Sequence, residues 1–180
     1  MIKRSTEGLG WANRLEDERG AALIELALCL PVALVLVFGV IEFSQIIFDE
    51  QIMSGLSRQG SDLSSRGTTL ATTVSALGAQ GGSLNMGTQG AIIITEVANN
   101  SSGAPQIVDQ AESATGISVT SNIGSGAGNP ATVPANAINL LNDGETLFVT
   151  EVFYSYTPMT PVGSFLKMNL TSTLYDVAYF

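Results

Sequence analysis

One run of apolar residues near the N-terminus constrains the fold of this chain more than any other feature. From Ala21 to Phe48 the only charged residues are Glu25 and Glu42. As an α-helix rising about 1.5 Å per residue, this run spans roughly 42 Å, more than the ~30 Å of hydrocarbon in a bilayer. The run therefore predicts one transmembrane helix. Pro31 predicts a kink in it, because proline removes a backbone hydrogen bond.

The Lys and Arg residues are unevenly placed around this run. Lys3, Arg4, Arg14 and Arg19 precede it, and the next cation is Arg58. Because Lys and Arg beside a span tend to stay in the cytoplasm, we expect the N-terminus to be cytoplasmic, with a single pass through the membrane and the C-terminal part outside. After residue 20 the chain carries twelve acids and three cations. Such an acidic surface predicts no nucleic-acid partner.

A cleaved secretory signal and a lipoprotein signal are two alternatives for the same run. The far end of the run, residues 41–45, has no A-x-A-like pair for a signal peptidase. Leu28 precedes Cys29 at the position where a lipoprotein signal needs a small residue. We interpret Cys29, the single cysteine of the chain, as a small apolar residue in the membrane, so the exported part has no disulfide.

Two separate segments resemble a known family. The first is Gly20–Glu25, followed by Leu30-Pro31 and by Gly39–Phe43, and the second is Val149–Pro158. Together they resemble the TadE-like, pilin-related proteins of the tight-adherence (Tad, or Flp) pilus systems of bacteria and archaea. The resemblance implies an α+β fold, in which a long pilin-like N-terminal helix packs on a small, mostly antiparallel β-sheet.

The resemblance also implies that a membrane prepilin peptidase cuts the chain between Gly20 and Ala21. Residues 1–20 would be a cytoplasmic leader, 21–48 the transmembrane helix and 49–180 the exported domain. Glycine suits a cleavage site because its backbone is unhindered and flexible. The implied partners are the peptidase, other pilin-like subunits, Tad assembly proteins in the inner membrane, and membrane lipid.

Glu25 is a carboxylate at the start of a membrane helix, where transfer from water costs a few kcal/mol. The resemblance implies that Glu25 pairs with the new N-terminal amine of a neighbouring subunit and so acts in subunit assembly. A low dielectric strengthens such an attraction. The alternative is a carboxylate that reaches back to the interface and is stabilised by the helix dipole.

Three features separate the chain from the major pilins of these systems. Leu26, rather than an aromatic residue, follows the glutamate, and the chain is much longer than a major pilin. The acidic residues 16–18 stand just before the proposed cut, where leaders are usually basic. The first two features favour a minor pilin or pseudopilin-like component over the main fibre subunit.

Helical periodicity continues beyond the span through Ile52, Leu56, Gln59 and Leu63, and Gly67 is a reasonable stop. We expect this face to pack on the chain's own sheet; the alternative is contact with a neighbouring subunit's helix. Residues 67–90 are rich in Ser, Thr and Gly and predict a loop with at most a helical turn.

The remaining residues predict strands and turns. β-branched and aromatic runs predict strands at 91–97, 106–111, 117–120, 146–156 and 169–180, with the fourth in a central position. A short helix is expected at 135–141. Turns are expected at 99–103 and 142–144, and Pro158 and Pro161 should open a loop. The Gly-rich residues 124–128 lack the ending of a phosphate loop and predict a surface loop.

Little in the composition points to catalysis. The chain has no histidine and one cysteine, so His-based chemistry, a metal site and a cofactor are not expected. Asp143 and Glu145 stand in a predicted turn, where solvation explains them. Glu151 interrupts an apolar strand; we expect it at a rim facing water, with a functional acid or a subunit contact as the alternative.

We therefore expect no enzyme but a structural subunit that supports pilus assembly, adhesion and biofilm formation. The alternative is a permanently anchored envelope protein that keeps residues 1–20. Such a protein would bind a polysaccharide or protein ligand through its Gly-, Ser- and Asn-rich loops.

Overall fold

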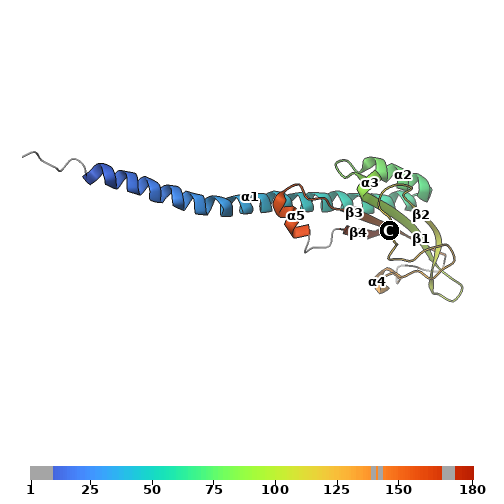
Figure 1. The fold of residues 1–180 in the computed structure, drawn as a ribbon. Helices are drawn as coiled ribbons and strands as arrows, with labels where there is room; N and C mark the ends of the chain where they lie inside the picture. Colours follow the sequence, from blue (N-terminus) through green and yellow to red (C-terminus); the bar gives the residue numbers. More distant parts are fainter. Residues whose placement is uncertain (1–9, 139–140, 142–143, 168–172) are drawn as a thin grey trace, which may run out of the picture.

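A computed structural model describes residues 10–138, 141, 144–167 and 173–180 of the chain. One long helix projects from a small domain that packs against its C-terminal end (Figure 1). The elements in chain order are α1 (Gly10–Ser65), α2 (Leu70–Gln80), α3 (Met86–Gln89), β1 (Gly90–Asn99), β2 (Pro105–Glu112), α4 (Ala135–Ile138), β3 (Thr146–Ser155), α5 (Pro161–Lys167) and β4 (Thr173–Tyr179). The predicted α+β class, a long helix on an antiparallel sheet, is confirmed.

The described strands form one antiparallel sheet in the order β2-β1-β3-β4. The inner position of β3 is confirmed, as is the pairing of the last strand with it, from Val149 opposite Tyr179 to Ser155 opposite Thr173. The β1–β2 hairpin is confirmed too. Its turn is held by the side-chain oxygen of Asn100, which accepts the backbone N–H groups of Ser102 and Ala104.

The second half of α1 packs on the sheet through a face of small residues. Gly60 lies so close to the sheet that an added Cβ would stand 2.7 Å from atoms of Leu77 and Thr150. Beside it, the Ser61 hydroxyl is 3.0 Å from Thr150 Oγ1 and 3.0 Å from the carbonyl oxygen of Ala178. Packing on the chain's own sheet is therefore confirmed. The buried face is rotated from the predicted one, however, and Gln59 is exposed.

The prediction for residues 67–90 is wrong, because they contain α2 and α3. Thr69 caps α2 by accepting the backbone N–H of Thr72 at 3.4 Å. Leu70, Val74 and Leu77 are buried beneath it, at a spacing typical of one helix face. Small residues between these three dilute the apolar pattern in the sequence, which explains the error.

The other face of the sheet is covered by irregular chain rather than by helices. Ile123, Ala131 and Val133 pack there against residues of β1, β2 and β3. The strand predicted at 117–120 is wrong: a hydrogen bond from the N–H of Ile117 to the carbonyl of Gly90 holds the start of this segment, which has no strand structure. The surface loop at 124–128 is confirmed.

Three further predictions concern the C-terminal third. The short helix expected at 135–141 is present over 135–138, as α4, and Leu141 is not helical. Residues 139–140, the turn residues 142 and 143 and the first four of the predicted last strand, 169–172, lie outside the described residues. Pro161 does not open a loop but begins α5. Proline favours the first position of a helix, where its missing N–H is not needed, and the Thr160 hydroxyl accepts the N–H of Gly163 at 3.1 Å.

Candidate assembly site on the apolar helix

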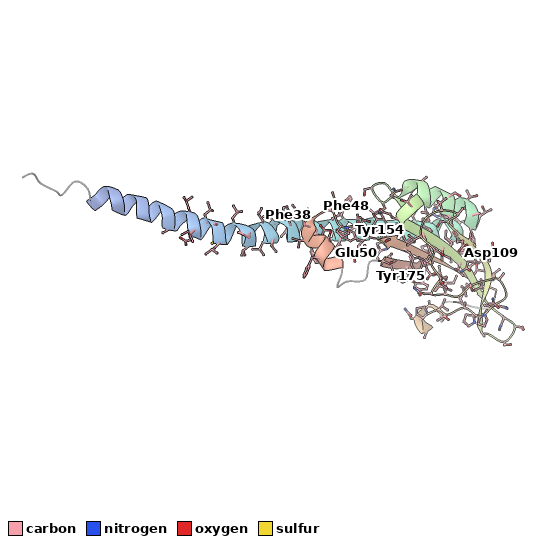
Figure 2. The ribbon with its side chains drawn as sticks, viewed as in Figure 1. Phe38, Phe48, Glu50, Asp109, Tyr154 and Tyr175 are labelled. Carbon is pink, nitrogen blue, oxygen red and sulfur yellow. The ribbon has the colours of Figure 1, made fainter. Side chains whose placement is uncertain are left out.

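The first half of α1 is an isolated helix with apolar residues on every side. All side chains from Ala21 to Val37 are exposed, and Figure 2 shows them standing out from the ribbon around the axis. Within the described residues one helix, Gly20–Ser65, is long and apolar enough to cross a membrane, and none of its most apolar window is buried. A helix that is apolar all round needs lipid or other helices to cover it. This helix fits a single-pass membrane protein.

Gly20 and Ala21 lie within α1, and both are exposed. A Cβ added at Gly20 would have no atom within 4 Å. The helical backbone here must unwind before a peptidase can bind it in extended form. Since nothing packs on Gly20, that unwinding would cost no tertiary contact. Cleavage at this bond stays a prediction.

Glu25 is also exposed, and its helix offers it no partner. The residues one turn away on the same side are Ala21, Ala22, Leu28 and Cys29, none of which carries a side-chain group that pairs with a carboxylate. A group that pairs with Glu25 must therefore come from the solvent, from lipid, from another chain or from a backbone terminus. The assembly role of Glu25 stays a prediction.

Pro31 and Cys29 lie on the same exposed half. The helix continues through Pro31 without interruption (Figure 1). The kink expected there stays a prediction. Cys29 is a free thiol on the exposed surface of the helix, among apolar neighbours, as expected for a small apolar residue facing lipid.

A second site, the Glu42 clasp, was missed by sequence reasoning. Glu42 is only 1% exposed, and its carboxylate accepts hydrogen bonds from the Tyr156 hydroxyl, from the backbone N–H groups of Met159 (3.2 Å) and Thr160 (3.1 Å), and from the Thr160 hydroxyl (2.7 Å). A Cβ on Gly163 would overlap the carboxylate, so a side chain there would displace it. The clasp fastens the segment between β3 and α5 to the side of α1.

The sequence did contain a signal for this clasp. Thr160-Pro161 is typical of a helix start, because threonine caps the first turn and proline suits its first position. The N–H groups that bind Glu42, those of Met159 and Thr160, lie directly before this first turn, so the helix start marks their place in the chain. The pattern could not identify the anion, the carboxylate of Glu42, because it lies more than a hundred positions away in the sequence.

The prediction for Glu151 is wrong. It is fully buried rather than at a rim, and it accepts hydrogen bonds from the Ser121 hydroxyl, from the N–H of Asn122 at 2.8 Å and from the Tyr175 hydroxyl at 3.0 Å. The loop at 121–122 covers this face of the sheet and supplies the donors that a buried carboxylate needs. Glu151 thereby fastens that loop to β3.

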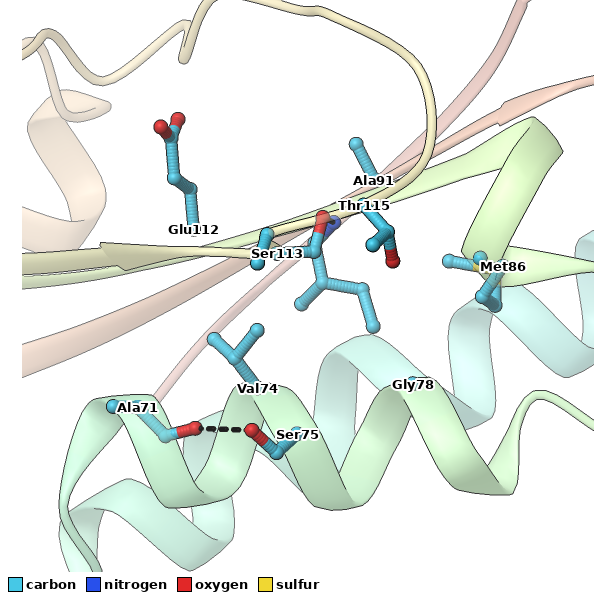
Figure 3. A pocket seen from close by; sticks show the side chains of 12 residues that line it. Ala71, Val74, Ser75, Gly78, Met86, Ala91, Glu112, Ser113 and Thr115 are labelled. Atoms are coloured by element: carbon cyan, nitrogen blue, oxygen red, sulfur yellow. Dashed lines mark hydrogen bonds between the residues drawn. The ribbon is translucent and has the colours of Figure 1, made fainter.

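A hollow of about 420 Å³ lies between α2 and the end of β2 (Figure 3). Two of its polar side chains are hydrogen-bonded to backbone groups of its own lining: Ser75 donates to the carbonyl of Ala71 at 2.9 Å, and Ser113 accepts the N–H of Ile92 at 3.2 Å. The Glu112 carboxylate points away from α2. Among the described residues no three His, Cys, Asp or Glu side chains form a group that could hold a metal ion. The hollow gives no argument for catalysis.

Comparison with known proteins gives one match. The model of a family described as TadE-like protein matches residues 20–62. No curated protein and no solved structure is detectably similar to the chain. The match begins at Gly20, includes Glu25 and Glu42, and ends within the sheet-packed half of α1, so it leaves out Val149–Pro158. It suggests a pilin-like protein associated with tight-adherence pili. Over residues 20–62 the chain is thus similar to the TadE-like family, which confirms the first of the two segments on which the resemblance rested.

Proposed function

We propose that this protein is a minor pilin or pseudopilin-like structural subunit of a tight-adherence pilus system, where it supports pilus assembly, adhesion and biofilm formation. The observation that carries the proposal is the exposed, apolar first half of α1, which lies at the start of the TadE-like match. Such a helix can be held in a bilayer and can pass into a bundle of like helices. Because the Lys and Arg residues before the apolar run favour the cytoplasmic side, the N-terminus lies in the cytoplasm and the domain outside the inner membrane.

The first step of this function is cleavage by a prepilin peptidase between Gly20 and Ala21. The bond is exposed and free of packing, as an enzyme at the membrane surface requires. The test is the intact mass of the protein purified from membranes of cells with and without the peptidase. We expect loss of residues 1–20 only when the peptidase is present. Gly20→Val should block it, whereas Gly39→Val, at another glycine without atoms near its Cβ, should not.

An unprocessed N-terminus in cells with active peptidase would contradict this step. It would favour the alternative, an anchored envelope protein that keeps residues 1–20 and binds a ligand through its loops. The exposed loop residues 125–128 and 100–103, rich in Gly, Ser and Asn, suit this alternative.

The second step is assembly through Glu25. Cleavage would free an amine at Ala21, and a carboxylate in a low-dielectric environment gains more from an opposite charge than it does in water. Ala21 stands one turn before Glu25 on the same helix face, so pairing within the chain competes with pairing between subunits. Pairing between subunits would favour docking in one register.

The matching experiment compares Glu25→Ala and Glu25→Gln with Glu112→Ala, which removes an exposed carboxylate at the end of β2. We expect both Glu25 variants to insert into the membrane normally and to reduce the pili recovered by shearing. The Glu112 variant should behave as the unaltered protein does. Unchanged piliation in the Glu25 variants would remove this role, while leaving the membrane anchor and the processing step standing.

A further inference from the structure

We propose that residues 158–167, which we call the foot, rest in the headgroup region on the outer face of the membrane and bind phospholipid there. The foot comprises the residues after Tyr156 and Thr157 that lead into α5, together with α5 itself. In Figure 1, α5 lies beside α1 on the side of the domain that faces the bare helix. The inference rests on the transmembrane placement of α1 in the proposed function.

The Glu42 clasp fixes the height of the foot along α1. Its hydrogen bonds to Met159 and Thr160 hold the foot at the level of residue 42. From Gly20 to Glu42 the helix rises about 33 Å at ~1.5 Å per residue, and the hydrocarbon core is ~30 Å thick. With Gly20 at the inner boundary, residue 42 stands at the outer boundary, and so does the foot.

The outer side of the foot has the chemistry of a membrane interface. Met159 is 73% exposed and Phe165 is 67% exposed, and these are the two most exposed large hydrophobic side chains among the described residues beyond Phe48. Phe43, next to Glu42 on α1, is 66% exposed, so an apolar side chain is exposed at this level on the helix as well as on the foot. Aromatic and long apolar side chains at this depth bind the boundary between acyl chains and headgroups.

The charge of the foot supports lipid rather than a second copy of the chain as its occupant. Lys167, at the end of α5, is the single Lys or Arg after Arg66 in the whole sequence, and the rest of the chain after Arg66 is acidic. A cation two positions after Phe165 in the sequence complements lipid phosphate. The same arrangement explains the buried carboxylate. With the foot seated at the membrane surface, Glu42 is shielded from hydrocarbon by protein donors.

The test places one tryptophan at a time in the full chain, after Trp11→Phe has removed the native one. Phe165→Trp probes the foot, Leu34→Trp probes the span, and Val108→Trp probes the far domain on β2; all three native side chains are exposed. The protein is reconstituted in phosphatidylcholine–phosphatidylglycerol vesicles whose acyl chains carry bromine near the headgroup or near the chain end. Bromine quenches tryptophan emission only at close range.

We expect the probe at position 165 to lose emission with bromine near the headgroup, the probe at position 34 with deep bromine, and the probe at position 108 with neither. Quenching at position 34 without quenching at position 165 would overturn the proposal that the foot lies in the headgroup region, while the transmembrane placement of α1 would stand. Absence of quenching at both positions would overturn the span itself, and the proposed function with it. The two failures are thereby distinguished.

A second copy is the rival occupant, and dilution tests it. Quenching at position 165 should stay the same as the ratio of protein to lipid is lowered. Quenching that appears only after dilution would show that another copy covers the foot at higher density and would overturn the proposal. Gly163→Ala, which displaces the Glu42 carboxylate, should abolish quenching at position 165 and leave that at position 34 unchanged. Unchanged quenching at both positions would show that the clasp does not set the depth.

Discussion

The hydroxyl of Tyr156 donates a hydrogen bond to the carboxylate of Glu42, which lies 114 positions earlier in the chain. This contact, with those of Met159 and Thr160, closes the domain onto α1 at the point where the bare helix begins. It divides α1 into an exposed half and a half that is part of the domain core.

Removal of the Glu42 carboxylate should destabilise the domain. Glu42→Ala leaves the Tyr156 and Thr160 hydroxyls and two backbone N–H groups without their acceptor. We expect the free energy of unfolding to fall by about 2–4 kcal/mol, since buried donors without acceptors cost ~1–3 kcal/mol each and partly regain water. Urea unfolding in detergent, followed by near-ultraviolet circular dichroism, measures it. Glu50→Ala, at an exposed position of α1, is the control and should change stability little.

Alanine substitutions at two glycines of α1 should change stability in opposite directions. Gly60→Ala brings a Cβ to 2.7 Å from Leu77 and Thr150 and should destabilise the domain by about 1–3 kcal/mol through overpacking. Gly55→Ala adds a Cβ with no atom within 4 Å and should stabilise the helix by roughly 0.5–1 kcal/mol. The same unfolding assay decides. Equal effects at both positions would contradict the close approach of α1 to the sheet.

Glu151 should hold the loop at residues 121–122 in place. Glu151→Val removes the acceptor of the Asn122 N–H and of the Tyr175 hydroxyl, so we expect that loop to open more often. Hydrogen exchange followed by mass spectrometry should show faster exchange in peptides that contain Asn122. In Glu112→Val, whose side chain is exposed on β2, these peptides should exchange at the original rate. Slow exchange in the Glu151 variant would mean that the loop is held by its apolar contacts alone.

Alkaline pH should destabilise the domain through its tyrosines. Burial raises the pKa of Tyr154, Tyr156, Tyr175 and Tyr179, and for Tyr156 the hydrogen bond to Glu42 raises it further. These are all the tyrosines of the chain. A folded-state pKa above the unfolded value of about 10 means that the stability is fully present below pH ~10. It is lost as pH rises toward the folded-state values.

The measurement is the phenolate absorbance and the unfolding free energy as functions of pH. We expect ionisation to lag behind that of free tyrosine and to coincide with unfolding. Tyr156→Phe should make the fall in stability with pH less steep. Ionisation of all four phenols at the free value in a folded protein would contradict the burial described here.

The sequence predicted the elements that depend on local pattern. The apolar run from Ala21 to Phe48 and the β-branched runs of β1 and β3 specify a long helix and inner strands without help from distant residues. α2 was missed because its apolar positions are separated by small residues with no strong helical preference. Its helix forms because Leu77 and its neighbours find a buried site against α1 and the sheet.

The carboxylates show where sequence reasoning stops. Glu42 and Glu151 stand among apolar residues, and the sequence alone could not tell a charge facing water from one enclosed by donors. The difference depends on loops far along the chain, at 159–160 and at 121–122, which bring backbone N–H groups to them. Gly60 shows the same limit: it lowers helix propensity, but its value lies in the close packing it permits against Thr150.

The attachment of α1 to the rest of the domain at several points has a mechanical consequence. Polar contacts tie the helix at Glu42, at Ser57, whose hydroxyl bonds the Asp176 carboxylate, and at Ser61. From the first to the last of these the helix rises about 28 Å, at ~1.5 Å per residue. A force that pulls the helix out of the domain is therefore shared by the hydrogen bonds at these three residues, and they must break together. The domain can thus stay folded on α1 when the helix is pulled.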